Sequence, residues 1–591
     1  MQDPAYRTAE ELDRFLGDPD DPSGWFSHAR CLDLDEKEEF PAEICRRLDD
    51  WGLPSYYVPE EHGGRLTGYA GLIQLIRVIA RRDLTVAIGH GKTYLGGVCV
   101  WVAGRAEQAA RLGADVRAGV PVSLGLTERD HGSDLLASEV QGAAGAEGWV
   151  VSGEKWLINN ATRGSLLSLL ARTATAGGPR GFSILLVDKR ELDKGMYHHL
   201  PKVHTHGIRG ADISGIAFDQ ARIDRSALVG AEGGGLEIAL KALQLTRTLC
   251  AALSLGAADH GLRLAVDFTQ QRELYGRLLG NLPQARRTLG TAAADVLLHE
   301  ALAIVASRLV HTQTDEMSIT AAVTKYTLPS GTEDVLARLT QLLGARAFLK
   351  GVHAGGMFQK VERDHRIVGL FDGNTLVNLN SLVNQFRSLV RGRRRGTGDT
   401  AGARAAYDLS LPVPVFRPDR LSLVARHGSG VLAGLNESVA RLAALAGEQP
   451  ALAPAAEAAR RIAAVSDRVH AEMERWQGVL GDVPPAAFET ARRYTLCHTA
   501  AACLGLWTHS SRLFTGTSAA PLWQDGLWLR AALGRLLERL GEPDAGDGEA
   551  YEELVDHLVA TRRSGELFSL YPYRLPAASL RSADDSTSVS N

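Results

Sequence analysis

The sequence predicts a mainly helical α+β protein: an N-terminal helical domain, a central β-barrel or β-sandwich domain, a four-helix-type bundle and an additional C-terminal helical domain. Apolar residues recur at three- and four-residue spacing before about residue 120 and after about residue 236, which is typical of amphipathic helices. Between these stretches, short β-rich segments alternate with Gly, Asp and Asn, as strands joined by turns do. A chain of 591 residues is also too long for a single core, so we expect several domains.

The first two domains differ in texture. Residues 1–120 contain helix-like runs such as "DEKEEFPAEICRRLDDWGL" and "GYAGLIQLIRVIARRD", and "VPEEHGG" between them is a loop by its Pro and Gly content. Residues 121–235 contain the strand-like runs "VPVSLGL", "GWVVSGEKWLI", "SLLSLLART" and "GFSILLVD". We therefore expect the β domain to begin near residue 121 and to end near residue 235.

Long helical patterns return in the second half of the chain. Residues 236–390 should form the helical bundle, and residues 406–580, rich in Ala and Leu, the extra helical domain. The segment 391–405, "RGRRRGTGDTAGARA", is basic and Gly-rich and is expected to be a linker. Its Arg cluster could instead bind a phosphate or an acidic partner. The Ser- and Asp-rich end, 581–591, is expected to be a disordered tail.

Composition narrows the function classes. The formal net charge of −4 argues against a nucleic-acid role, because no excess of basic residues is available to neutralise phosphates. The six cysteines are scattered without CxxC spacing, which indicates reduced core residues and neither disulfides nor a metal site. The N-terminus lacks a basic-then-apolar signal, and no uninterrupted apolar run approaches the ~18 residues of a membrane span. We expect a soluble, cytoplasmic protein with no membrane span.

Six short motifs occur in a fixed order: "VPEEHGG" (58–64), "LTERDHGSD" (126–134), "VSGEKWLINNATRG" (151–164), "RELYG" (272–276), "QLLGARAF" (341–348) and "RDHRIVGLFDGNT" (363–375). Each alone is a common turn or cap. Together, on a chain that runs helical, β and helical, they resemble the motifs of the acyl-CoA dehydrogenase flavoprotein family. The resemblance covers about residues 25–390 and leaves the C-terminal helices outside, although some larger family members carry extra C-terminal helices.

The resemblance implies FAD as the cofactor. In "LTERDHGSD" a β-like run opens into a loop whose backbone N–H groups could approach the flavin, with Gly132 allowing close approach and Ser133 adding a hydroxyl. The matching Arg in the family, here Arg272, reaches FAD from a neighbouring subunit, which implies a homodimer or a dimer of dimers. Strand-end capping for Thr127, Ser133 and Asn159, and a surface ion pair for Arg272, are the alternatives. The resemblance assigns to the cofactor Leu126, Thr127, Gly132, Ser133, Ile158, Asn159, Arg272, Tyr275, Gln284, Gln341, Gly344, Gly373 and Asn374.

Asp372 stands where the family has a catalytic Glu, which removes the α-proton of an acyl thioester as the β-hydrogen leaves as hydride to flavin N5. The resemblance implies Asp372 as this base, one methylene shorter. An apolar slot that loses its water when substrate binds would raise the pKa of such a base toward neutrality. Phe371 and the run 367–370 are expected to form that slot. Taken alone, the Asp-Gly-Asn turn indicates only helix punctuation, and this alternative stays open.

The resemblance also implies substrate contacts for Ser133, Arg247 and Phe371. In "LQLTR" (243–247), Gln244 stands where many relatives have Asp, while Arg247 is kept. Together with the polar bulk of Arg129 and His131 in the signature loop, this leaves open whether the acyl group is carried by CoA or by an acyl carrier protein. Carrier-bound chains occur in relatives that desaturate fatty acyl groups for secondary metabolites.

The leading hypothesis is therefore FAD-dependent α,β-dehydrogenation of an acyl thioester, with an electron-transfer flavoprotein as the acceptor. A first alternative is an oxidase, epoxidase or monooxygenase of the same fold, in which oxygen reacts with the reduced flavin. A second alternative is a non-catalytic carrier-binding or assembly subunit, which would contain no FAD.

Overall fold

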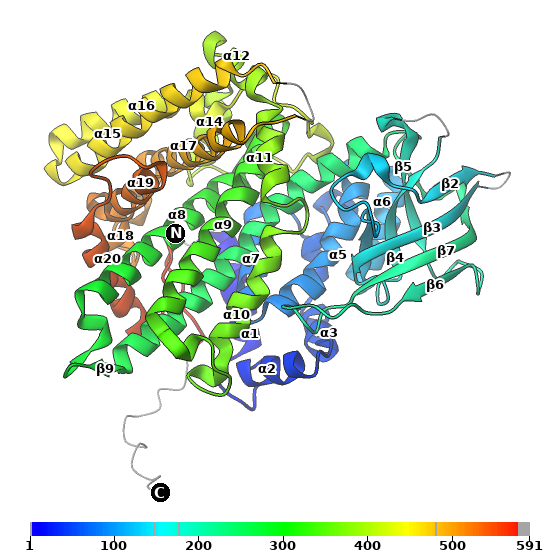
Figure 1. Cartoon of the computed structure of the whole chain (residues 1–591), viewed down its shortest axis with the longest axis horizontal. Coiled ribbons are helices and arrows are strands. Elements are labelled where there is room, and N and C mark those ends of the chain that lie inside the picture. The colour runs from blue at the N-terminus through cyan, green and yellow to red at the C-terminus, as the bar shows by residue number, and fades with distance from the viewer. Residues whose placement is uncertain (1–2, 146–147, 175–177, 479–481, 577–591) are drawn as a thin grey trace, which may run out of the picture.

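The computed structural model describes residues 3–145, 148–174, 178–478 and 482–576 (Figure 1). Its N-terminal part is helical, as predicted. Asp83 separates two of these helices: it ends the first, and its side chain caps the second by accepting a hydrogen bond from the Val86 N–H at 3.0 Å. The helices are α1 (Pro4–Leu16), α2 (His28–Glu36), α3 (Ala42–Trp51), α4 (Tyr69–Arg82), α5 (Leu84–Ala103) and α6 (Ala106–Arg117).

The β domain forms one mixed sheet of eight strands, at the right of Figure 1. The strands follow the order β6-β7-β3-β2-β4-β5-β8, and β1 pairs in parallel with β4. The predicted strand-like runs correspond to β1, β3, β4 and β5, and the second of them pairs along its whole length with β7. The bounds are β1 (Val122–Gly125), β2 (Gln141–Ala144), β3 (Gly148–Asn159), β4 (Leu166–Arg172), β5 (Phe182–Asp188), β6 (Tyr197–Leu200), β7 (Ile213–Asp224) and β8 (Leu228–Val229).

The helical bundle is built around the long helix α7, which packs against α4, α5, α8 and α9. In the described part of the chain, α7 and α8 are long and apolar enough to cross a membrane, but 83% and 100% of their apolar windows are buried inside the protein. They are core helices, since a helix apolar on all sides needs to be enclosed. The bounds are α7 (Gly235–Gln271), β9 (Glu273–Leu274), β10 (Arg277–Leu278), α8 (Pro283–Thr312), α9 (Met317–Leu343), α10 (Met357–His365) and α11 (Thr375–Val383).

The expected linker is largely helical, which corrects that prediction. Helix α12 (Phe386–Arg395) extends into it, and α13 (Thr400–Tyr407) follows after a short break. Two of the arginines form ion pairs on α16 (Ala453–Arg475), Arg393 with Asp467 and Arg394 with Glu474. An Arg-rich run that looks like solvated chain in the sequence is thus largely helical, and two of its arginines contact the extra domain.

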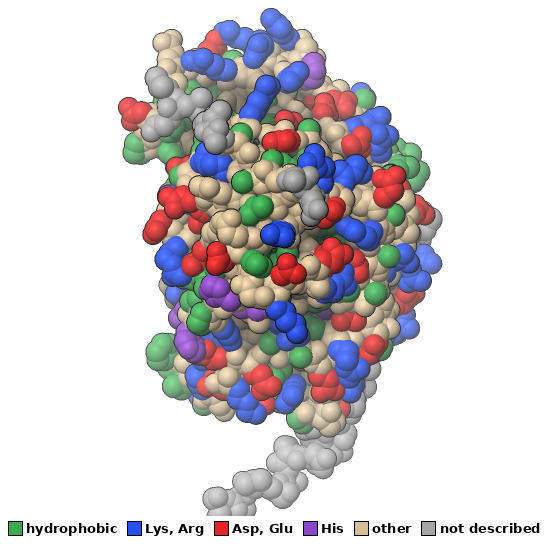
Figure 2. All heavy atoms as spheres, turned by 90° about the vertical axis from the view of Figure 1, so that its right-hand side faces the viewer, with side chains coloured by type: hydrophobic (Ala, Val, Ile, Leu, Met, Phe, Trp, Pro, Cys, Tyr) green, Lys and Arg blue, Asp and Glu red, His purple; other side chains and the backbone are tan. Residues whose placement is uncertain are grey.

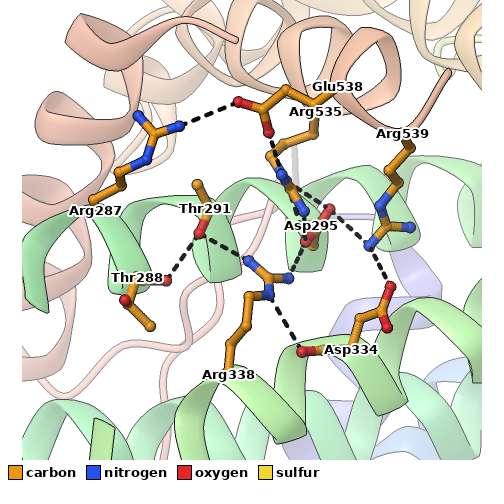
Figure 3. A network of polar contacts seen from close by, with 9 residues as sticks. All are labelled: Arg287, Thr288, Thr291, Asp295, Asp334, Arg338, Arg535, Glu538 and Arg539. Atoms are coloured by element: carbon orange, nitrogen blue, oxygen red, sulfur yellow. Dashed lines mark hydrogen bonds and ion pairs between the residues drawn. The ribbon is translucent and has the colours of Figure 1, made fainter. Parts of the chain in front are cut away.

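The extra domain covers α8, as Figure 1 shows for α17 and α19. A polar network fixes this contact: Asp295 of α8 is fully buried and binds Arg338 of α9 and Arg535 and Arg539 of α19 (Figure 3). The remaining helices are α14 (Gly430–Ala433), α15 (Leu435–Glu448), α17 (Pro485–Ser510), α18 (Ala520–Trp523), α19 (Leu527–Leu540) and α20 (Gly548–Arg563). The tail predicted for 581–591 lies outside the described residues.

The end of the described chain returns to its beginning. The rings of Tyr6 in α1 and Tyr571 stack with their centroids 4.0 Å apart, and the Tyr573 hydroxyl donates to Asp13 at 3.1 Å. On the face turned toward the viewer in Figure 2, basic and acidic side chains are interspersed, with no broad field of one sign over the β domain. That distribution agrees with the small net charge of the sequence.

Candidate active site

Asp372 lies on a tight turn between the buried end of α10 and the start of α11. Its backbone has φ +56°, and Gly373 follows with φ +91°. Asn374 then caps α11, because its side-chain oxygen accepts a hydrogen bond from the Val377 N–H at 2.9 Å. The carbonyl oxygen of Asp372 accepts a hydrogen bond from Arg247 Nε at 2.8 Å, which ties the turn to α7. Helix punctuation therefore describes Asn374, while the Asp372 side chain lines a cavity.

That cavity is small, about 30 Å³, and mostly apolar. Its walls come from α4, α5 and α7, which converge on the Asp372 turn. Of the predicted slot residues, Phe371 lines it, whereas Leu370 is 63% exposed and faces solvent, which corrects its expected role. The lining residues are Ile76, Ala87, Ile88, Gly91, Lys92, Tyr94, Leu95, Thr246, Leu249, Cys250, Leu253, Phe371 and Asp372.

Lys92 belongs to this cavity and was not predicted from the sequence. Its ammonium nitrogen lies 3.1 and 3.2 Å from the two carboxylate oxygens of Asp372 and 3.8 Å from the centroid of the Phe371 ring. The side chains of the pair are only 11% and 10% exposed. The available signal was local: Lys92 is the single Lys, Arg, Asp or Glu in the twenty residues of α5. A lone charge in an otherwise apolar helix needs a buried partner.

Two further polar groups lie beside Asp372 and Phe371, and one of them, Cys250, also lines the cavity. Burial raises the pKa of the Cys250 thiol to about 11, so it is a neutral neighbour 3.9 Å from Asp372. Lys325 of α9 lies under Phe371, 5.0 Å from the ring centroid, and donates to the Val368 carbonyl. Burial lowers the pKa of Lys325, and Cys250 and Asp372 oppose that shift.

The β domain contributes a second set of predicted residues, where β3 contains a bulge. Its pairing with β7 shifts register between Trp156 and Ile158, and Leu157 between them has φ +59°. The bulge re-aims the end of the strand, so that Ile158 is buried and both amide atoms of Asn159 are enclosed without a hydrogen-bond partner among the described residues. Orphaned buried polar atoms fit a ligand edge that would satisfy them. Asn159 could therefore hold the polar edge of a cofactor such as FAD.

Hydrogen bonds to β3 and to the residues before β2 hold the start of the signature loop, which follows β1. Glu128 accepts hydrogen bonds from Lys155 Nζ at 2.7 Å and from the Val140 N–H at 3.1 Å, and the Thr127 carbonyl accepts from the Trp156 N–H at 3.1 Å. Leu126, next to these hydrogen bonds, is buried, whereas Gly132 and Ser133 at the tip of the loop are exposed. A Cβ at Gly132 would meet no atom within 4 Å, so the loop tip leaves open space for a ligand.

The remaining predicted cofactor residues lie far from Asp372. Arg272 caps the C-terminal end of α7, 25 residues or roughly 37 Å along the helix from Arg247. Tyr275 on the β9–β10 turn is 93% exposed, and Gln284, Gln341 and Gly344 are exposed as well. One copy of the chain therefore does not bring these residues to the Asp372 cavity.

A larger cavity of about 430 Å³ lies between α1, α7 and α20. None of the residues assigned from the motifs lines it. Its charged walls are largely paired with each other, for example Arg81 with Asp13 and Arg263 with Asp20. It therefore does not compete with the Asp372 cavity as the reaction site.

The comparisons with known proteins match the part of the chain that contains the six motifs. Residues 27–119, 123–221 and 233–386 match the N-terminal, middle and C-terminal domains of acyl-CoA dehydrogenase. The chain belongs to the acyl-CoA dehydrogenase family. Members of this family are FAD-dependent oxidoreductases, and this acyl-CoA dehydrogenase family member is accordingly an enzyme with FAD as its cofactor.

The individual relatives have low sequence identity to this chain. A probable acyl-CoA dehydrogenase fadE25 of Mycobacterium leprae is 24% identical over 360 residues, which cover 61% of this chain and 90% of that protein. Butyryl-CoA dehydrogenase of Megasphaera elsdenii superposes with a TM-score of 0.59 at 20% identity, covering 64% of this chain and 97% of that one. An acyl-CoA dehydrogenase of Bacillus anthracis, solved with FAD, covers 95% of each chain with a TM-score of 0.69 at 16% identity. The extra C-terminal helices thus have a structural counterpart.

Proposed function

We propose that the chain catalyses FAD-dependent α,β-dehydrogenation of an acyl thioester, with Asp372 as the base that accepts the α-proton. The observation that carries the proposal is the carboxylate of Asp372 in the wall of a mostly apolar cavity between α4, α5 and α7. When bound, FAD supplies the acceptor for the β-hydrogen and its electron pair. Leu126, Ile158 and Asn159 are the residues of this chain that would hold its ring.

The protein's own part in the step is to orient and to move one proton. The α C–H bond breaks, its proton goes to a carboxylate oxygen of Asp372, and the electron pair forms the new double bond as the β-hydrogen leaves. Arg247 holds the Asp372 carbonyl, so the base stays on its turn while its side chain reacts. The apolar walls exclude water, which strengthens every charge interaction in the cavity.

The Asp372 turn also limits where the substrate lies. A shorter side chain than Glu reaches less far from the backbone, and a base needs its proton within about 3 Å. Positive φ at Asp372 and Gly373 turns the backbone of this loop sharply, between the end of α10 and the start of α11. The acyl α-carbon is therefore proposed to lie close against Phe371 and Lys92.

Partners follow from the same proposal. The thioester is carried by CoA or an acyl carrier protein, and the reduced cofactor passes electrons to an electron-transfer flavoprotein in the cytoplasm. Tyr275 at 93% exposure and Phe348 at 86% are large aromatic groups left in solvent, which supports a homodimer or a dimer of dimers that covers them.

The direct test is Asp372→Asn. Bound FAD should remain, because the change keeps the size of the side chain, while substrate-dependent bleaching of the flavin in the absence of air should fall by about three orders of magnitude or more. Asp525→Asn is the matched control, since Asp525 is also an Asp with positive φ, +54°, but lies exposed in the extra domain. Undiminished bleaching in Asp372→Asn would remove this residue from the mechanism.

The same experiment identifies the electron acceptor by the rate at which the flavin colour returns. With a flavoprotein acceptor, admitting air to the bleached enzyme should restore the yellow colour only slowly. Rapid recovery would favour an oxidase, and running matched CoA and carrier-protein thioesters in parallel would identify the carrier.

A further inference from the structure

The surroundings of the Asp372 turn hold more positive than negative charge. Lys92 binds the Asp372 carboxylate and lines the cavity, Arg247 donates to the Asp372 backbone carbonyl, and Lys325 lies against the Phe371 ring. All four are largely enclosed: the side chains of the Lys92–Asp372 pair are about one-tenth exposed, Lys325 is 1% exposed and Arg247 is 7% exposed. The Cys250 thiol adds no charge, because burial raises its pKa to about 11.

Two of the cations have only neutral acceptors. Arg247 donates to the carbonyl oxygen of Asp372, and Lys325 donates to the carbonyl oxygen of Val368. Within the described residues, neither forms an ion pair of its own. Glu333 of α9 is the next carboxylate to act on Lys325, but it is exposed to solvent. Buried cations without a counter-ion are costly, so an added negative charge beside the Asp372 turn would be stabilised by them.

Lys92 is the cation that can change partner. It extends from α5 across the cavity wall, and its contact with the Phe371 ring does not depend on Asp372. An ammonium is a flexible point charge that accepts any nearby oxygen acceptor, unlike the forked guanidinium of Arg247. A second carboxylate in the cavity could therefore take Lys92 while Lys92 stays against Phe371.

We propose that this site selects acyl groups that end in a carboxylate, and that Lys92 is the residue that determines this specificity. The inference rests on the proposed dehydrogenation. The carboxylate of the substrate replaces Asp372 as the partner of Lys92, so that Asp372 is released to take the α-proton. The right substrate thus activates its own base, and a neutral acyl group leaves the Lys92–Asp372 pair closed.

The geometry also limits the length of the acyl group. A carboxylate two or three carbons beyond the α-carbon lies within roughly 4 Å of it, given about 1.5 Å for each C–C bond. The Lys92 ammonium lies 3.1 Å from the Asp372 carboxylate, which takes the α-proton. A substrate carboxylate about 4 Å from the α-carbon therefore reaches Lys92. The substrate class is therefore an ω-carboxyacyl thioester of four or five carbons.

The test compares one substrate with its neutral counterpart. The CoA thioester of a five-carbon dicarboxylic acid and the methyl ester of its free carboxylate have the same chain and differ in charge. The unmodified enzyme should reduce its flavin with the carboxylate at least about tenfold more efficiently, in kcat/KM, than with the ester. Lys92→Met should bring this ratio close to one, and Lys92→Arg should restore part of it.

A control separates specificity from a general loss of function. Lys37→Met removes an exposed lysine from the surface, so it should leave the ratio unchanged. Equal activity of the unmodified enzyme with acid and ester would overturn the inference while leaving the dehydrogenation intact. A fall in both activities by the same factor in Lys92→Met would also overturn it, and would make Lys92 a positioning partner of Asp372 only.

Binding distinguishes failure of the inference from failure of the proposed function. A thioether analogue of the same five-carbon acid, in which a CH₂ group replaces the thioester carbonyl, cannot be dehydrogenated, and its affinity is measured by calorimetry. Preference for the acid over its ester, lost in Lys92→Met, supports the carboxylate site even if no thioester is turned over. No preference in binding overturns the site whatever the activity shows.

Discussion

Asp295 and Asp372 are both carboxylates enclosed by cations, and they differ in how many of those cations bind them. Asp295 accepts contacts from Arg338, Arg535 and Arg539 and is fully buried (Figure 3). Asp372 binds the ammonium of Lys92 alone and borders a cavity. A carboxylate held by three guanidinium groups is fixed, whereas a carboxylate with a single flexible partner can exchange it. The first arrangement suits the seam between two domains and the second suits a reaction.

The electrostatics of the two sites reflect the same difference. Burial alone would raise the pKa of Asp295, but Arg539, Arg535 and Arg338 more than offset this and hold it well below its usual range. Its neighbour His299 is also buried, which lowers the pKa of its imidazole to about 3 and keeps it neutral. The Asp295 carboxylate therefore stays ionised at a pH well below the one at which an ordinary Asp takes up its proton.

The largest expected effect is on stability, from Asp295→Asn. Removing the charge leaves three guanidinium groups without their counter-ion, which should lower the free energy of unfolding by about 3–5 kcal/mol. Urea unfolding followed by fluorescence measures this. Asp334→Asn is the control: Asp334 pairs with the same Arg539 but is 69% exposed, so its loss should cost less than about 1 kcal/mol. Equal losses in both variants would mean that the seam is not held by buried charge.

Glu316 extends the comparison of Asp295 and Asp372, because it is a buried carboxylate with no cation bound to it among the described residues. It accepts hydrogen bonds from the Gly430 N–H at 2.7 Å and the Asp399 N–H at 3.3 Å. Burial raises its pKa to about 7, and these two backbone donors only partly oppose the shift. The folded state therefore holds its proton at a pH where the unfolded chain has lost it.

The sign of the pH dependence follows. As pH rises from the unfolded pKa of about 4.5 through the folded value of about 7, stability should fall, by up to about 3 kcal/mol from this group. Glu316→Gln is neutral throughout and should remove that slope. Thermal unfolding of both proteins at pH 5 and pH 8 measures the difference. A slope that persists unchanged in the variant would assign it to other groups.

The smallest effect is expected at Asn159, where the unpartnered group is uncharged. Asn159→Ala removes two buried polar atoms that we propose FAD satisfies, so FAD affinity should fall by about tenfold with the fold unchanged. Fluorescence titration of the apoprotein with FAD measures this. Asn378→Ala is unsuitable as a control, since Asn378 donates to the Gly373 carbonyl at 2.9 Å, next to the proposed base Asp372. Gln220→Ala, on the exposed part of β7, is the better one.

The sequence allowed the order of domains and much of the site to be predicted, because those features are local. "RDHRIVGLFDGNT" places Asp372 and its turn within a few residues, and Asn159 follows from the strand motif that contains it. Lys92 was missed because it meets Asp372 across 280 residues. Its place as the one charge of the apolar helix α5 indicates a buried partner but not which residue that partner is. The helix α12 was missed because its Arg-rich face is neutralised by α16, which only the fold brings close.

The clasp between Tyr6 and Tyr571 has a consequence for how the protein is made. Tyr571 and Tyr573 pack on α1, and α17, α19 and α20 pack on the face of α8 that α4, α7 and α9 leave open. Both surfaces therefore stay uncovered during synthesis until more than 500 residues of the chain have been made. Cutting the chain back to the 386 residues that the family domains reach would expose them permanently.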